Sequence, residues 1–261
     1  MKVAIVSGGS RGIGKETAIC LSNNGYKVYE LSRSGETNNE ITHVDCDLTN
    51  IQSIKDAICV ILHESERIDL LVNNAGFGIS GAIEYTKLDD VKKQFDVNFF
   101  GLIELTQQTL PYLRKSQGKI INISSVGGVF ALPYQAYYSA TKFALNGYTL
   151  ALKNEVKRFK VSVCAVMPGD TRSGFTSARQ KNQDGLAIYG DSITRSISIM
   201  EKDEQNGMSV SKVGKRICKI AKKRKNKPLY IIGFKYKIFY FLSKILPIRF
   251  VNYIVGKLYA K

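Results

Sequence analysis

The feature that most limits the fold of this chain is a regular alternation of short apolar runs with longer segments of helical periodicity. The runs are rich in Val and Ile and occupy residues 2–6, 27–31, 41–44, 69–72, 119–123, 161–166 and 229–233. Several intervening segments carry apolar residues at helical spacing and are long enough for crossover helices, at about 13–24, 50–64, 88–115 and 135–158. Such alternation is typical of βαβ units, so we expect an α/β fold, a doubly wound parallel sheet with helices on both faces.

A glycine-rich turn follows the first apolar run. It reads Ser7-Gly8-Gly9-Ser10-Arg11-Gly12-Ile13-Gly14 and leads directly into a helical segment. Without Cβ atoms, its glycines can adopt tight-turn dihedrals and let a phosphate approach the backbone. Helix N–H groups and the helix dipole stabilise negative charge at this place. The turn therefore favours binding of a dinucleotide pyrophosphate, although glycine-rich turns also occur for steric reasons alone.

Four motifs, in this order, narrow the class of protein. They are Gly-x-x-x-Gly-x-Gly at residues 8–14, Asn73-Asn74-Ala75-Gly76, Ser125 ahead of Tyr138-Ser139-Ala140-Thr141-Lys142, and Pro168-Gly169. Together they resemble the short-chain dehydrogenase/reductase family over about residues 2–175. Ser7 stands where this family most often has Thr, which keeps a hydroxyl group. The resemblance implies a single Rossmann-like domain and an oxidoreductase that interconverts a ketone and a secondary alcohol by hydride transfer.

The resemblance implies a catalytic group made of Ser125, Tyr138 and Lys142, with Asn98 as a fourth member that holds a water linked to the lysine. Tyr138 and Lys142 are four residues apart, so both project from one face of a helix. A cation within ~4–6 Å lowers a tyrosine pKa by ~1–3 units, so we expect Lys142 to tune Tyr138 as a general acid and base. Ser125 is placed to donate a hydrogen bond to the substrate oxygen.

Residues of the same type stand beside two members of this group. Only Tyr138, not Tyr137, has a lysine four residues later. Ser125 lies thirteen residues before Tyr138, as the serine of the family does, so we expect Ser124 to be structural. Taken without the other motifs, a tyrosine and a lysine at helical spacing would rather indicate a solvated helix face.

The preferred dinucleotide depends on the end of the second apolar run, Leu31-Ser32-Arg33-Ser34. Ser32 falls where NAD-dependent relatives of the family place an Asp, and Arg33 follows it. A planar guanidinium suits the 2′-phosphate of NADP, so we predict NADP(H), with NAD(H) as the alternative if Glu30 were the ribose anchor. The full set of cofactor-binding residues that the resemblance implies is Ser7, Gly8, Ser10, Arg11, Gly12, Ile13, Gly14, Ser32, Arg33, Asp47, Leu48, Asn74, Ala75, Gly76, Tyr138, Lys142, Pro168, Gly169 and Thr171.

Cysteine and histidine usage gives no sign of a disulfide framework or a metal site. The five cysteines are odd in number, scattered and never spaced as CxxC. His43 and His63 lack a neighbouring carboxylate cluster, so we expect no metal. The first apolar run is too short for a secretory signal, and we expect a cytoplasmic protein.

The positive charge of the chain is concentrated near its end. The formal net charge is +16, and residues 212–261 hold 15 Lys and Arg and no acidic residue. From residue 234 the pattern predicts two amphipathic segments separated by Pro247. Such segments fit helices packed on their own domain, on a second subunit or peripherally on a membrane surface. No run reaches the ~18–20 apolar residues of a membrane span, and nothing in the cluster Lys222–Lys225 resembles a module that reads nucleic acid bases.

The remaining segments set expectations about domains, substrate and assembly. We interpret residues 170–211 as a lid within a domain of residues 1–233, followed by a basic extension, residues 234–261. The lid and the aromatic extension favour a small lipophilic carbonyl or alcohol substrate, for which a hydroxysteroid is our first prediction. The alternatives are a 3-oxoacyl-[acyl-carrier-protein] reductase and a non-catalytic protein that binds nucleotide or membrane. The resemblance also implies a homodimer or homotetramer formed through 98–115 and 135–158.

Overall fold

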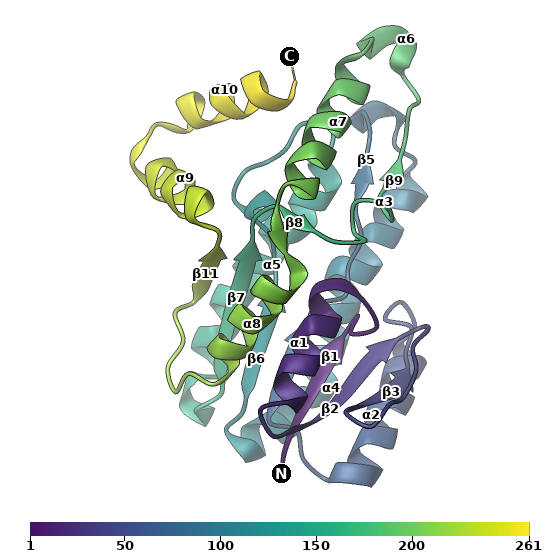
Figure 1. Ribbon diagram of the computed structural model, residues 1–261, viewed down its shortest axis with the longest axis vertical. Coiled ribbons are helices and arrows are strands. Elements are labelled where there is room, and N and C mark those ends of the chain that lie inside the picture. Colours follow the sequence, from purple (N-terminus) through teal and green to yellow (C-terminus); the bar gives the residue numbers. More distant parts are fainter. Residues whose placement is uncertain (261) are drawn as a thin grey trace.

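The computed structural model describes residues 1–260, and its centre is a sheet of seven parallel strands (Figure 1). The order across the sheet is β11-β7-β6-β4-β1-β2-β3. This confirms the prediction of a doubly wound α/β fold, and each strand lies within two residues of an apolar run identified in the sequence. The strands are β1 (Lys2–Ser7), β2 (Tyr26–Ser32), β3 (Ile41–Asp45), β4 (Leu70–Asn73), β6 (Lys119–Ile123), β7 (Ser162–Pro168) and β11 (Leu229–Ile232).

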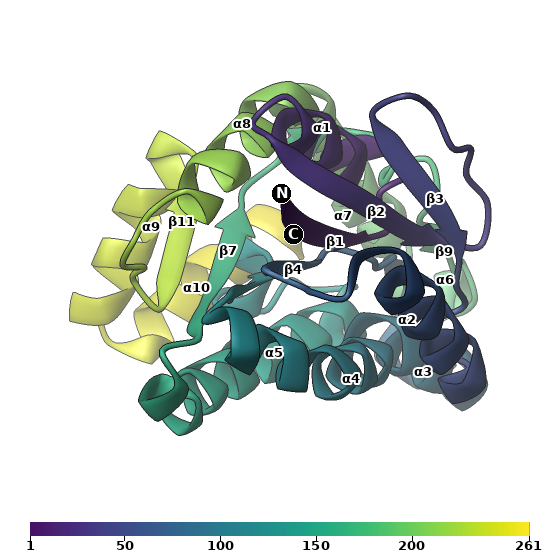
Figure 2. The ribbon, with the colours of Figure 1, turned by 90° about the horizontal axis from the view of Figure 1, so that it is seen from below.

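Helices cover both faces of this sheet (Figure 2). One face is covered by α1 (Gly12–Ser22) and α8 (Val210–Ala221), the other by α2 (Ile51–Ser65), α4 (Gly101–Ser116) and α5 (Ala136–Glu155). Successive strand residues point to opposite faces, so Val28 belongs to the core under α1 and Tyr29 to the core under α2. Because both faces are buried, the strands are almost continuously apolar rather than alternating.

Helix α8 was not anticipated as an element, because its sequence reads first as a basic cluster. It buries Val213, Ile217 and Ile220 against α1 and the sheet. Gly214 allows close packing, since a Cβ there would lie 2.7 Å from the Cβ of Glu16 on α1. Four of the 15 Lys and Arg of residues 212–261 therefore lie on the solvated face of a packed helix.

The predicted helical segment 88–115 is divided in two by a wider turn. It consists of α3 (Leu88–Phe95), a π-helical turn (Asp96–Phe100) and α4. The π-helical turn carries Asn98 and buries it. Turns of this kind are frequent at functional sites because they redirect side chains out of the regular helical register.

The segment expected to be a lid, residues 170–211, has secondary structure of its own beyond the carboxyl ends of the strands (Figure 1). One short strand pair, β5 (Ile79–Ser80) with β9 (Gln180–Lys181), ties it to the body of the protein, and a second, β8 (Thr171–Arg172) with β10 (Met208–Ser209), joins its two ends. Between them lie α6 (Leu186–Tyr189) and α7 (Ser192–Gln205).

Two helices follow the last strand. They are α9 (Phe234–Ile245) and α10 (Ile248–Tyr259), joined at Pro247, and α10 returns to pack on α7 (Figure 1). Within residues 1–260, no helix combines the length and the apolar character needed to cross a membrane. Short 3-10 turns complete the described chain at Ile83–Tyr85, Val126–Gly128 and Lys157–Phe159.

Candidate active site

The motifs meet at the carboxyl ends of the central strands. The glycine-rich turn follows β1, Asn73–Gly76 follows or ends β4, Ser125 follows β6, and Pro168-Gly169 follows β7. Parallel strands bring all their carboxyl ends to one edge of the sheet. This edge, beside the neighbouring strands β1 and β4 where the strand order reverses, is the usual ligand-binding place in doubly wound folds.

The glycine-rich turn has a shape that suits a phosphate group. Gly8 and Gly12 adopt left-handed conformations, with φ of +64° and +58°. A Cβ on Gly14 would lie 2.2 Å from the carbonyl oxygen of Gly8, so the turn leaves room only for glycine there. No side chain caps the N–H groups at the start of α1. These donors and the helix dipole fit the pyrophosphate of a dinucleotide.

The side chains of Ser7 and Asn74 join this turn to the turn after β4. Ser7 Oγ accepts hydrogen bonds from the backbone N–H groups of Asn74 (3.0 Å) and Ala75 (3.2 Å). Asn74 Nδ2 donates to the carbonyl oxygens of Ser7 (3.1 Å) and Gly8 (3.0 Å). The side chains of Ser7 and Asn74 thus hold the two turns together through internal hydrogen bonds. The hydroxyl at position 7 is used, which is why serine can replace threonine there.

At the end of β2, Glu30 and Arg33 have different surroundings. Glu30 is 3% exposed, contacts the His43 ring and accepts a hydrogen bond from Ser32 Oγ (3.2 Å). Arg33 is exposed. The pKa of Asp47 is lowered mainly by the backbone N–H of Thr49 and also by the charge of Arg33, which places Arg33 and Asp47 near each other. Glu30 is therefore bonded inside the protein, whereas Arg33 faces outward.

Ser125 and Tyr138 lie on either side of Gly127. Ser125 Oγ accepts a hydrogen bond from the Gly127 N–H (3.0 Å), which caps the short turn after β6. A Cβ on Gly127 would lie 3.4 Å from both Ser125 Oγ and Tyr138 Cε1. Tyr138 and Lys142 occupy the first turns of α5, with Lys142 Nζ 5.7 Å from the centre of the tyrosine ring. Lys142 Nζ donates to the carbonyl oxygen of Ile123 (2.9 Å).

Burial dominates the acid–base properties of this pair. Burial raises the pKa of Tyr138 to about 12, although the Ser125 side chain acts in the opposite direction. Burial lowers the pKa of Lys142 to about 8. The expected lowering of the Tyr138 pKa by Lys142 is not found in the protein alone, because desolvation of the phenol outweighs the nearby charges. At neutral pH, Tyr138 holds its proton and Lys142 its charge.

Three neighbouring polar residues are held by the backbone. Asn98 donates to the carbonyl oxygen of Phe77 (2.9 Å) and accepts from its N–H (3.0 Å). Tyr137 donates to the carbonyl oxygen of Ile83 (3.1 Å), and Ser124 donates to that of Lys142 (3.3 Å). Tyr137 and Ser124 are thus committed to internal contacts, whereas Asn98 fixes the chain after β4 beside Lys142.

A second polar cluster adjoins Tyr138 and was missed by the sequence reasoning. The ring of Phe175 packs on that of Tyr138, with centroids 5.5 Å apart. The guanidinium of Arg179 lies 5.7 Å from the other ring, that of Phe175, and pairs with Glu204 of α7. Gln135 accepts from Arg179 Nε (2.9 Å) in the amide orientation that satisfies both side chains. No motif marks these residues, and only their pairing across the fold reveals them.

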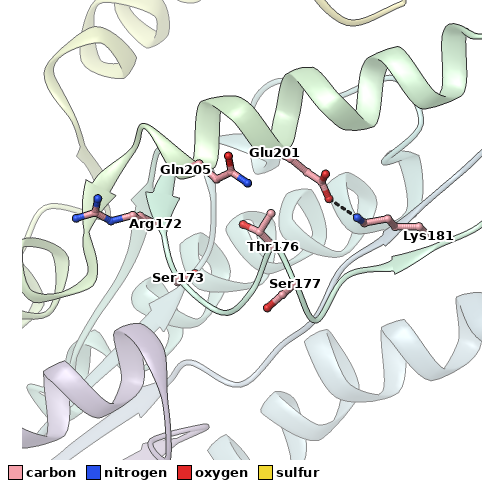
Figure 3. A pocket seen from close by; sticks show the side chains of 7 residues that line it. All are labelled: Arg172, Ser173, Thr176, Ser177, Lys181, Glu201 and Gln205. Carbon is pink, nitrogen blue, oxygen red and sulfur yellow. Dashed lines mark ion pairs between the residues drawn. The ribbon is translucent and has the colours of Figure 1, made fainter.

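Residues between Arg172 and Gln205 also line a pocket of about 330 Å³ (Figure 3). The side chains of Lys181 and Glu201 point toward each other across it and form an ion pair of 2.6 Å. The residues that line it are all polar or charged in type and include neither Ser125 nor Tyr138. The lining residues are Arg172, Ser173, Thr176, Ser177, Lys181, Glu201 and Gln205.

The C-terminal helices also reach the site. Tyr236 of α9 packs so closely on Gly169 that a Cβ on the glycine would lie 2.0 Å from the ring. Its hydroxyl donates to Asp170, and Lys235 Nζ lies 3.3 Å from the same carboxylate. Residues after the last strand therefore shape the edge where β7 ends.

A parallel sheet with a phosphate-accepting turn, and with serine, tyrosine and lysine gathered beside it, defines a nicotinamide-dependent oxidoreductase. The sequence profile described as short chain dehydrogenase matches residues 2–184. The chain belongs to the short-chain dehydrogenase family.

Relatives extend this likeness beyond the motifs. The chain is 42% identical over 269 aligned residues to 3-ketodihydrosphingosine reductase of Bacteroides thetaiotaomicron, covering 99% of this chain and 98% of that protein. It is 35% identical to a probable short-chain type dehydrogenase/reductase of Helicobacter pylori, covering 94% and 93% of the two chains. The crystal structure of a short-chain dehydrogenase from Streptomyces avermitilis superposes with a TM-score of 0.83 at 27% identity, over 94% and 93% of the two chains. The match to the Bacteroides reductase therefore extends beyond the motif-bearing region and includes most of the residues after β11.

Proposed function

We propose that this protein is an NADPH-dependent reductase that converts the ketone of a single-chain amphiphilic lipid, of the 3-ketodihydrosphingosine class, into a secondary alcohol. The observation that carries the reaction is the placement of Tyr138 beside Ser125 and Lys142 at the carboxyl edge of the sheet. The substrate class is supported by the relative of that name, which matches almost the whole chain.

Tyr138 acts as the proton donor in this proposal. Bound NADPH supplies the hydride for the carbonyl carbon. Tyr138 gives its phenolic proton to the carbonyl oxygen, and the Ser125 hydroxyl donates a hydrogen bond to the same oxygen. The ammonium of Lys142 stabilises the phenolate that proton transfer leaves behind. Burial raises the pKa of Tyr138 to about 12, so Tyr138 carries at neutral pH the proton that ketone reduction consumes.

The different surroundings of Arg33 and Glu30 support the proposed preference for NADPH. Arg33 is exposed and can meet a 2′-phosphate, while the buried Glu30 is held by His43. We expect Arg33→Ser to raise the KM for NADPH about tenfold, the value of one charge-assisted hydrogen bond, and to leave the KM for NADH unchanged. Arg224→Ser, at another exposed arginine, is the matched control. A wild-type preference for NADH would contradict the proposal.

Substrate class is tested by NADPH consumption across three ketones. These are 3-ketodihydrosphingosine, a ketosteroid and an acetoacetyl thioester, each assayed with wild type and with Tyr138→Phe. We expect the highest kcat/KM with 3-ketodihydrosphingosine, and a loss of turnover in the variant. A higher value for the steroid would restore the hydroxysteroid prediction, and a higher value for the thioester would favour 3-oxoacyl reduction. A protein that binds NADPH and reduces none of them would be a nucleotide-binding protein without this activity.

A further inference from the structure

Helix α9 leaves its larger apolar side facing outward. Its inward side is made of Tyr236 and Tyr240. Phe234, Ile238, Phe241 and Ile245 recur at helical spacing on another side, and Phe241 and Ile245 are 64% and 65% exposed. One strip of α9 is thus an apolar surface without a partner among the described residues.

Helix α10 repeats the arrangement. Its less exposed side carries Val251, Val255 and Tyr259, and α10 contacts α7. Tyr259 packs against the buried cluster that includes Ile197 of α7, and its hydroxyl donates to Asp203 (3.2 Å). Phe250, Ile254 and Leu258 form a separate outward strip. Packing on the body of the protein therefore uses only part of the apolar surface of α10.

Exposed large apolar side chains are concentrated on α9 and α10. Of the 22 large apolar side chains that are exposed in residues 1–260, 11 lie between residues 234 and 258, so this short stretch accounts for half. Single exposed apolar residues are ordinary, but a contiguous group marks an interaction surface. The group, called here the outward face, consists of Phe234, Ile238, Phe239, Phe241, Leu242, Ile245, Ile248, Phe250, Tyr253, Ile254 and Leu258.

The charges around the outward face determine which partner fits. Lys237, Lys244, Arg249 and Lys257 are exposed on the same two helices, and no acidic residue follows Glu204 in the chain. A second copy docked through the same face would bring these cations against their own kind, which is destabilising. An anionic lipid surface offers both an apolar layer and opposite charge.

We propose that the outward face docks on the surface of an anionic lipid bilayer. The apolar side chains enter the boundary of the acyl chains, and the lysines and Arg249 lie at the lipid phosphates. The docked helices also border the active site, since Tyr236 packs on Gly169 and α10 packs on the helix that carries Glu204. Delivery of a lipid ketone from the bilayer to Tyr138 rests on the proposed function, whereas docking itself does not.

The test is co-sedimentation of the full chain with vesicles of phosphatidylcholine, with and without phosphatidylglycerol. We expect binding to the anionic vesicles that weakens at high salt, because the Debye length falls from ~10 Å at 0.1 M to ~3 Å at 1 M. The double variant Phe241→Ser/Ile245→Ser is expected to bind at least tenfold more weakly, and Lys237→Gln/Lys244→Gln about tenfold more weakly. Deleting the helices would be a poorer test, because Tyr236 is part of the packed edge of the site.

Matched controls separate docking from folding. Ile51→Ser/Leu88→Ser changes two similarly exposed apolar residues on α2 and α3 and should bind vesicles like wild type. Every variant should keep wild-type turnover of a ketone substrate dissolved in water. Equal binding by wild type and the α9 double variant would overturn the proposal. So would a wild-type dimer that the α9 variant dissociates while vesicles bind neither protein, since the partner would then be a second copy.

Turnover distinguishes the two proposals. Vesicle binding by a protein that reduces no lipid ketone would overturn the proposed function and leave docking intact. Reduction of the lipid in detergent by a protein that ignores vesicles would do the reverse.

Discussion

The edge of the sheet where the motifs meet and the C-terminal helix pair differ in where their side chains find partners. At the edge, polar side chains bond inside the protein: Ser7 and Asn74 hold the glycine turn, and Arg179 pairs with Glu204. On α9 and α10, eleven large apolar side chains remain exposed. Internal contacts between polar side chains thus determine the shape of the sheet edge. On α9 and α10, by contrast, the exposed apolar side chains remain available to a partner.

The largest expected effect concerns the hydroxyl that the edge of the sheet keeps protonated. Tyr138→Phe should lower kcat by about 10²–10⁴-fold, the usual contribution of a general acid, while NADPH binding changes little. Tyr137→Phe removes the adjacent hydroxyl, which bonds to Ile83, and should keep near wild-type kcat. Steady-state kinetics and NADPH titration measure both effects. Equal losses in the two variants would show that Tyr138 has no special role.

The same substitution in packed helix α8 and in α9 tests whether the outward apolar side chains differ from those of the core. Ile217 of α8 is fully buried and Ile245 of α9 is 65% exposed. Ile217→Ser should lower the free energy of unfolding by about 3–5 kcal/mol, because it leaves a cavity and buries a hydroxyl. Ile245→Ser should change it by less than about 0.5 kcal/mol. Urea unfolding followed by circular dichroism gives both values, and a large loss for Ile245→Ser would mean that the outward face is part of the core.

Breaking the ion pair between Arg179 and Glu204 should have a somewhat smaller effect on the free energy of unfolding. Arg179 is 4% exposed, so Arg179→Met leaves the Glu204 carboxylate without its cation. We expect a loss of about 2–3 kcal/mol in the free energy of unfolding, below that of a fully buried pair because Glu204 keeps some exposure. Arg179→Met/Glu204→Gln should recover part of the loss. Additive losses in the double variant would indicate that the pair does not act as a unit.

The smallest effect is the pH dependence of the Glu30–His43 contact. Burial lowers the pKa of His43, but hydrogen bonds to Asp45 and Glu30 outweigh it, so the net shift is upward from 6.5. Its stabilising contribution is complete below pH 6.5 and is lost as the pH rises through the folded-state pKa. The Tm difference between wild type and His43→Gln should therefore be larger at pH 5.5 than at pH 9.

The sequence was sufficient for the elements that repeat a local pattern. All seven strands of the sheet and α1, α2, α4 and α5 were located from periodicity. It was insufficient for α7 and α8, because polar and basic residues obscure a helix whose buried side is narrow. For the candidate site, it located the motif residues but not Phe175, Arg179 and Glu204, which belong to no motif.

By itself the sequence determined the parallel sheet, the glycine turn and the chemical groups at the strand ends. These depend on local periodicity and on backbone freedom at glycine, and parallel topology then brings the strand ends together. Only the tertiary structure decided the proton affinity of Tyr138, the internal use of Glu30 and the exposure of the apolar strips on α9 and α10. Those properties depend on desolvation and on contacts between distant segments, so no stretch of sequence carries them alone.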